Sequence, residues 1–110
     1  MISDGLRYYD IFGNQIDRWR WAELFEDLAY KTVEVTDMGS PSHPELADTR
    51  VSTVWLGIDH GYGGGPPIIF ETMVFSPIEE WDGVSYRYTT HAEAVEGHQM
   101  VVAELRASVS

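Results

Sequence analysis

Three side chains have the types needed for acid–base chemistry or for holding a metal ion: His60, Glu71 and His98. His60 lies in a glycine-rich loop between two apolar runs, and Glu71 lies inside the second run, IIFETMVF. An imidazole and a carboxylate can exchange a proton with a substrate, and two imidazoles with one carboxylate form a facial metal triad. A metal-dependent or acid–base hydrolase is therefore one hypothesis, and it requires the fold to bring these distant positions together.

Two of these residues, Glu71 and His98, also have purely structural explanations. Because burial of a bare charge is costly, we expect Glu71 to pair with Arg7, Arg50 or Arg87. His98 falls on the apolar face of the last expected helix, where a core histidine with one satisfied nitrogen is the commoner finding. The sequence therefore favours a protein that is not an enzyme, and it predicts no cofactor and no metal site.

The loop from Asp59 to Pro67, with the sequence DHGYGGGPP, is the second candidate for function. A phosphate-binding loop needs a lysine and a helix directly after the glycines, whereas this loop runs into two prolines and a strand. We predict instead a loop that contacts a protein partner, together with a tryptophan and acids further along the chain. The predicted contact residues are Asp59, His60, Tyr62, Glu79, Glu80, Trp81 and Asp82.

Charge and composition narrow the partners. The 110 residues include 18 acidic and 7 basic side chains, for a formal net charge of −11. Binding to phosphate backbones or to anionic membranes needs the opposite charge, so nucleic acid and membrane surfaces are disfavoured. A basic protein partner is allowed, and so is mimicry of nucleic-acid charge.

Cysteine and long apolar segments are both missing from the sequence. Without cysteine there is no thiolate nucleophile, disulfide or cysteine-bound zinc. No apolar run approaches the roughly 20 residues of a membrane span, and the first ten residues have no signal-peptide core. We expect a cytoplasmic protein.

The periodicity of apolar residues predicts both helices and strands. Gly13-Asn14 predicts a small hairpin within residues 6–16, and Asp17 caps a helix through about Leu28. Thr90 and Glu93 have capping-box spacing and begin a last helix that ends near Ser108. Alternation of β-branched and aromatic residues predicts four strands, over residues 31–38, 50–59, 68–75 and 84–89.

These elements predict a single α+β domain over residues 1–110. The expected order is hairpin–α–β–β–β–β–α, with an antiparallel sheet of about four to five strands and the C-terminal helix packed on one face. Both faces of residues 68–75 are mostly apolar, which indicates either cover on both sides or an open face that binds something. The turn-rich loop at residues 39–48 is the expected flexible segment.

Four segments in order carry a resemblance: LRYYDIFGNQI, RWAELFED, VSTVWLGIDHGYGGGPPIIFETMVF and YRYTTHAEAVEGH. In this arrangement the chain resembles a group of small uncharacterised proteins encoded by phages and prophages of actinobacteria. The resemblance implies an accessory factor that binds a host or phage protein in the bacterial cytoplasm, such as an inhibitor of a host enzyme or defence system. A virion or assembly component is the alternative. The resemblance supplies no catalytic residues.

Overall fold

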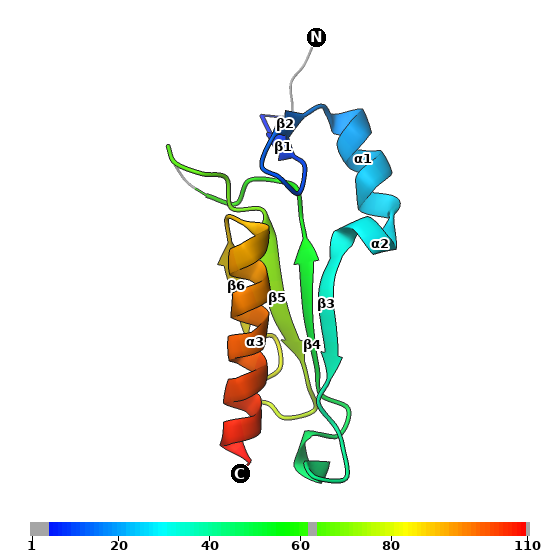
Figure 1. Cartoon of the computed structure of the whole chain (residues 1–110), viewed down its shortest axis with the longest axis vertical. Helices are drawn as coiled ribbons and strands as arrows, with labels where there is room; N and C mark the ends of the chain where they lie inside the picture. The colour runs from blue at the N-terminus through cyan, green and yellow to red at the C-terminus, as the bar shows by residue number, and fades with distance from the viewer. Residues whose placement is uncertain (1–4, 62–63, 110) are drawn as a thin grey trace.

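A four-stranded antiparallel sheet forms the body of the protein, and one long helix lies along one of its faces (Figure 1). The structure is a computed structural model that describes residues 5–61 and 64–109. The neighbouring strands, in their order across the sheet, are β3 (Thr32–Asp37), β4 (Arg50–Trp55), β5 (Phe70–Phe75) and β6 (Ser85–Tyr88). The helix is α3 (His91–Ser108). The predicted α+β class, with the C-terminal helix on one sheet face, is confirmed.

The N-terminal elements gather at one end of the sheet (Figure 1). They are β1 (Tyr8–Tyr9), β2 (Gln15–Ile16), α1 (Arg18–Glu26) and α2 (Leu28–Lys31). The predicted hairpin is confirmed, with Gly13 at a φ of 84° in its turn, which glycine adopts without strain. It forms a two-stranded sheet of its own, and a bridge between Tyr8 and Ile58 ties it to the chain beyond β4.

The predicted first helix is shorter than expected because Asp27 interrupts it. Asp17 caps α1 as predicted, its carboxylate accepting from the Arg20 amide at 2.8 Å. Asp27 then ends α1 and caps α2, accepting from the Tyr30 amide at 3.2 Å. The helical period does not continue through this break. The three- and four-residue spacing of Trp21, Leu24, Phe25 and Leu28 predicts that they share one apolar helix face. Leu28 is instead 73% exposed, so the prediction was wrong for this residue.

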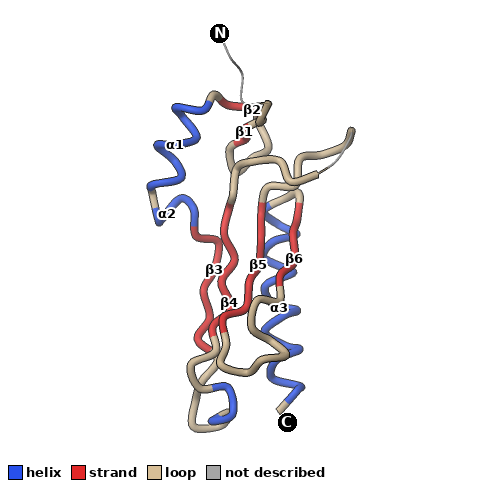
Figure 2. Tube along the Cα trace, turned by 180° about the vertical axis from the view of Figure 1, so that it is seen from behind, coloured by secondary structure: helices blue, strands red, loops and turns tan. Residues whose placement is uncertain are grey.

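The two faces of the sheet are covered differently. Val51, Thr53 and Trp55 of β4 point toward α3 and are fully buried, and Phe70, Thr72 and Val74 of β5 share that face. The opposite face carries the alternate residues. Figure 2 shows the strands from that side with no helix in front of them. Cover on both sides, one of the two expectations for the strand at residues 68–75, is therefore not found among the described elements.

The start and the packing of α3 follow from its sequence. The capping box is confirmed: the Glu93 amide donates to Thr90 Oγ1 at 3.1 Å, and the Thr90 amide donates to Glu93 Oε1 at 3.0 Å. The apolar periodicity of the last helix predicts that Val95 shares a face with His98, Val102 and Leu105, but Val95 is exposed. Glycine at position 97 allows the close approach of α3 to β6, because a Cβ there would collide with the Tyr88 ring.

Two buried clusters lie along the molecule, which measures 55 × 27 × 24 Å. The hairpin-end cluster contains Leu24, Trp55, Ile69, Phe70 and Ala94. The loop-end cluster contains Met38, Leu46, Val51, Val74, Val101, Val102 and Leu105. Leu46 comes from a 3₁₀ turn, Pro44–Leu46, inside the loop expected to be flexible. That loop is therefore anchored in the core by Leu46, near its C-terminal end.

Candidate functional site

His98 lies fully buried on α3, and both of its ring nitrogens have hydrogen-bond partners. Nε2 lies 2.8 Å from Thr36 Oγ1, and Nδ1 lies 2.7 Å from Thr53 Oγ1. Burial lowers the pKa of His98 because the charged form loses its hydration, while the carboxylate of Glu34 opposes this shift. The core-histidine interpretation therefore holds, with two satisfied nitrogens rather than one.

The hydroxyl groups around His98 continue into a buried polar chain. Thr53 Oγ1 is hydrogen-bonded to Thr72 Oγ1 at 2.5 Å, and the Tyr88 hydroxyl donates to Thr72 Oγ1 at 3.1 Å. Within the described residues, no buried side-chain nitrogen or oxygen lacks a hydrogen-bond partner. The polar atoms of this core satisfy one another, so they leave no unpaired group directed at a substrate.

Glu71 lies on the opposite face of the sheet from His98. Its Oε2 is 3.0 Å from Arg87 Nε, so Arg87 is the partner among the three arginines that the sequence offered. His60 lies beyond the end of β4, in the loop that leads to β5. The sheet separates Glu71 from His98, and the hydrolase hypothesis therefore loses its composite site.

The structure offers no alternative metal centre in the part of the chain that it describes. Across residues 5–61 and 64–109, no group of three histidine, aspartate or glutamate side chains could hold a metal ion. Metal ligation needs several such groups converging on one point.

The glycine-rich loop is closed at its base by Asp59. Its Oδ1 accepts from the Ile68 amide at 2.9 Å and from the Gly61 amide at 2.8 Å, and these two bonds, in that order, lower the pKa of the Asp59 carboxyl. Asp59 thus holds the loop together instead of presenting a free carboxylate. His60 is exposed, whereas Tyr62 lies outside the described residues.

The remaining predicted contact residues follow β5 at its other end (Figure 1). Glu79 and Glu80 are exposed, and Asp82 accepts from the Ser76 amide at 3.0 Å. Trp81 is half-buried against the loop-end cluster. Since the whole of β5 separates this segment from Asp59 and His60, the predicted contact residues that the structure describes belong to two surfaces and not to one.

Sequence reasoning found only part of the apolar surface at the N-terminal end. The spacing of Trp19 and Trp21 predicts that one of them is exposed, and Trp19 is 73% exposed while the Trp21 indole donates to the Leu56 carbonyl at 2.9 Å. Phe12 is 80% exposed in the hairpin turn. No rule of periodicity applies to a turn residue, so the exposure of Phe12 was not predicted.

The structure has a groove between β6 and α3 that was not predicted from the sequence. It has a cavity volume of about 180 Å³ and is lined by Tyr86, Tyr88, Gly97, Met100, Val101 and Glu104. The sequence shows two tyrosines on a strand and a methionine on a helix, which reads as ordinary packing. Only the position of β6 at the edge of the sheet leaves these side chains facing an opening.

Comparison with known proteins gives no information about the function of this chain. No protein family, no curated protein and no solved structure matches the chain. None of the helices in the described part has the length and apolar character needed to cross a membrane.

Proposed function

We propose that this chain is a small non-enzymatic accessory protein, of the phage type, that binds a host or phage protein. One observation carries the proposal. Among the residues that the structure describes, the three most exposed large apolar side chains all belong to the N-terminal end of the molecule: Phe12, Trp19 and Leu28. We call these three residues the apolar anchors.

Exposed aromatic side chains of this kind indicate a surface that contacts another protein, as opposed to one without a binding role. Tryptophan buries a large area with few rotatable bonds, and it is among the residues that contribute most to interface affinity. The Arg18 guanidinium lies over the Trp19 ring, 5.1 Å from the centroid, and Trp19 is 73% exposed. Most of its surface therefore remains available to a partner.

The predicted contact loop lies at the same end of the molecule as the anchors. Tyr8 pairs with Ile58, and the Asp59 amide donates to the Arg7 carbonyl at 3.3 Å. The base of the loop is thus joined to the hairpin that carries Phe12. We infer that the anchors form the centre of the contact and that His60 belongs to its rim.

The net charge of −11 complements a basic partner. Charge complementarity speeds encounter and makes binding weaken as salt screens it, whereas apolar anchors keep their contribution in salt. A partner held by both is expected to be released only partly by high salt.

The test is affinity capture from an actinobacterial host lysate, with and without phage infection, using tagged protein at low and high salt. We expect one near-stoichiometric partner with the native protein, and its loss with a Phe12→Ser, Trp19→Ser double variant. Val35→Ser is the matched control, because it removes an exposed apolar side chain from the open sheet face. Equal capture by the double variant, in a folded state shown by circular dichroism, would contradict the proposed contact. Absence of any partner, or incorporation of the chain into purified virions, would contradict the proposed function.

A further inference from the structure

The outer edge of β6 has backbone groups that point away from the sheet. The Val74 amide donates to the Val84 carbonyl at 2.9 Å and the Ile69 amide to the Tyr88 carbonyl at 3.1 Å, so the even-numbered residues here bond toward β5. Backbone groups alternate in direction along a strand. Those of Ser85 and Arg87 therefore point outward, where the described part of the chain places no further strand. An exposed edge of this kind can pair with an extended segment of another chain.

The groove beside this edge has apolar walls. Tyr86 is 44% exposed on the strand side and Met100 is 58% exposed on the helix side. Since roughly 150 Å³ is enough space for a benzene ring, the cavity of about 180 Å³ can receive one large apolar side chain. A strand added to β6 would direct every second side chain toward α3, and hence toward this groove.

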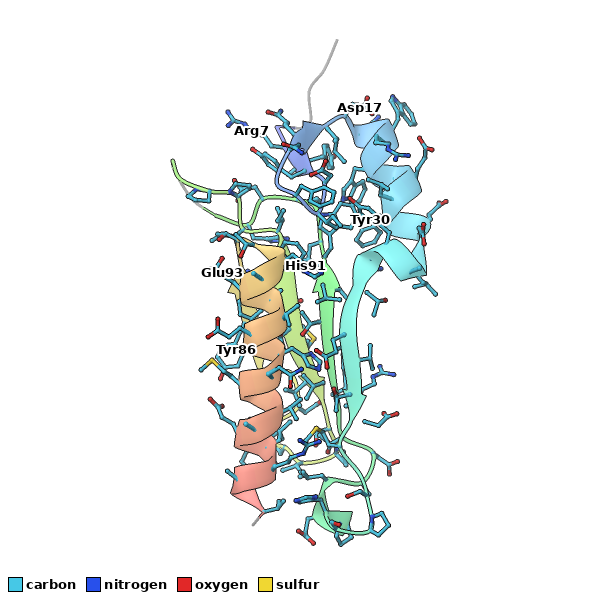
Figure 3. All side chains as sticks on the ribbon, viewed as in Figure 1. Arg7, Asp17, Tyr30, Tyr86, His91 and Glu93 are labelled. Carbon is cyan, nitrogen blue, oxygen red and sulfur yellow. The ribbon has the colours of Figure 1, made fainter. Side chains whose placement is uncertain are left out.

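The helix side of the groove is acidic. Glu96, Met100 and Glu104 follow at four-residue spacing and so share one side of α3, and Glu93 lies one turn before Gly97, which lines the groove. Figure 3 shows Glu93 and Tyr86 on the same side of the helix. The arginine of α3, Arg106, is two residues beyond Glu104 and therefore faces another way.

We propose that this groove binds an extended basic segment of a protein partner, which adds to the sheet as a strand beside β6. The inference rests on the proposed binding function and names a second contact for it. Main-chain bonds to Ser85 and Arg87 would fix the segment on the edge. One apolar side chain would fill the groove, and lysine or arginine side chains would meet the acids of α3.

The spacing of these acids predicts the sequence of the segment. Glu96 and Glu104 are two helical turns apart, which is about 12 Å. Residues i−2 and i+2 of a strand are about 13 Å apart and lie on the same face as residue i. The expected pattern is basic–x–apolar–x–basic. It is symmetric, so it fits a parallel or an antiparallel added strand.

Charge also argues against a second copy of this chain as the occupant. Two copies would each have a net charge of −11, and pairing of their β6 edges would bring the acidic side chains of both α3 helices close together. Like charges placed together at an interface oppose association. A basic heterologous segment removes this repulsion.

The test uses the full-length protein and fluorescent peptides. The probe contains lysine–threonine–leucine–threonine–lysine between serine flanks. Its matched control, threonine–lysine–leucine–lysine–threonine, has the same composition but turns both lysines to the other strand face. Fluorescence polarisation is expected to show about tenfold tighter binding of the probe, the amount that two exposed ion pairs supply.

Two protein variants locate the contact. Met100→Lys removes the apolar wall, and Glu104→Lys reverses one charge. Both positions are exposed and should leave the fold intact. Each is expected to weaken binding of the probe about five- to tenfold. Glu79→Lys makes the same charge change away from the groove and is expected to alter binding far less. Hydrogen exchange adds a direct readout: the probe should slow exchange of the Ser85 and Arg87 amides and leave Tyr86, already bonded to β5, little changed.

Several results would overturn the inference. One is absence of probe binding up to about 1 mM, beyond the range of weak peptide recognition. Equal affinity for probe and control, exchange protection elsewhere in the chain, or self-association through Met100 would also overturn it. These results are independent of lysate capture. If a partner is captured through the apolar anchors but the peptide does not bind, only the proposal for the groove is contradicted. If the peptide binds but no partner is captured, only the proposed function of the apolar anchors is contradicted.

Discussion

His98 is a histidine whose neutral form is built into the core. A neutral imidazole donates from one nitrogen and accepts at the other, which matches the two threonine hydroxyls that flank it in the chain through Thr53 and Thr72. The charged form would have to be accommodated in a fully buried position. The residue that looked most like a catalyst in the sequence therefore has a structural role.

The lowered pKa of His98 makes stability depend on pH. As the pH falls through the ordinary histidine range near 6.5, the unfolded chain takes up a proton that the folded protein resists, so the free energy of unfolding should decrease. Urea titrations between pH 8 and pH 5 measure this. We expect a smaller decrease in a His98→Gln variant, which keeps a donor and an acceptor but has no proton to bind.

His60→Gln is the control for this experiment, because it removes one exposed histidine without touching the core. Its pH profile should follow that of the native protein. A native profile that is flat over this range, or one unchanged by His98→Gln, would contradict the assignment.

Local contacts of individual side chains explain why neither Glu71 nor the Asp59–Pro67 loop supplies a catalytic group. Glu71 is held by Arg87, and Asp59 is held by two backbone amides. The sequence indicates an ion pair for Glu71, whereas the closure of the loop by Asp59 is seen only in the structure. Which arginine pairs with Glu71 depends on strand register, and the register of β5 against β6 places Arg87 directly opposite.

Among the elements, α3 has the strongest local definition. Its capping box satisfies amides that the helix itself leaves without partners, and its apolar side covers the sheet. Thr90→Ala should lower the free energy of unfolding by about 1 kcal/mol, since the cap is removed and little else changes. Urea denaturation measures the difference. Ser42→Ala, at an exposed loop position, serves as the control, and an equal effect of both would mean that the cap contributes nothing.

The break between α1 and α2 shows where local patterns fail. Trp21, Leu24 and Phe25 pack in or against the hairpin-end cluster, as the periodicity predicts. The same periodicity placed Leu28 beside them. Because Asp27 starts a new helix, Leu28 points elsewhere and becomes an apolar anchor instead.

For the whole molecule, the two buried clusters share strands and one helix. Trp55 of β4 and Phe70 of β5 belong to the hairpin-end cluster, while Val51 and Val74 of the same strands belong to the loop-end cluster. Damage at one end should therefore reach the other through continuous hydrogen-bonded strands. We expect a single cooperative unfolding transition.

Trp55→Ala tests this coupling. Trp55 is fully buried, so its truncation should lower the free energy of unfolding by about 3–5 kcal/mol. Native-state hydrogen exchange should then show faster exchange at Val101 and Leu105, at the other end of the sheet, by the same free energy. Leu28→Ala, at an exposed position, is the control. Unchanged exchange at Val101 and Leu105 would mean that the two ends unfold independently.

The sequence by itself determined the α+β class, the hairpin, the capped last helix and the alternation of side chains along β4. These features follow from neighbours within a few residues, through turn chemistry, capping and side-chain alternation. Only the tertiary structure decided that Glu71 and His98 face opposite sides of the sheet, and that Asp59 and His60 lie at the opposite end of β5 from Glu79, Glu80, Trp81 and Asp82. It alone placed β6 at an edge, which opened the groove beside α3. Strand order and register depend on contacts between residues far apart in the chain, and no local pattern encodes these contacts.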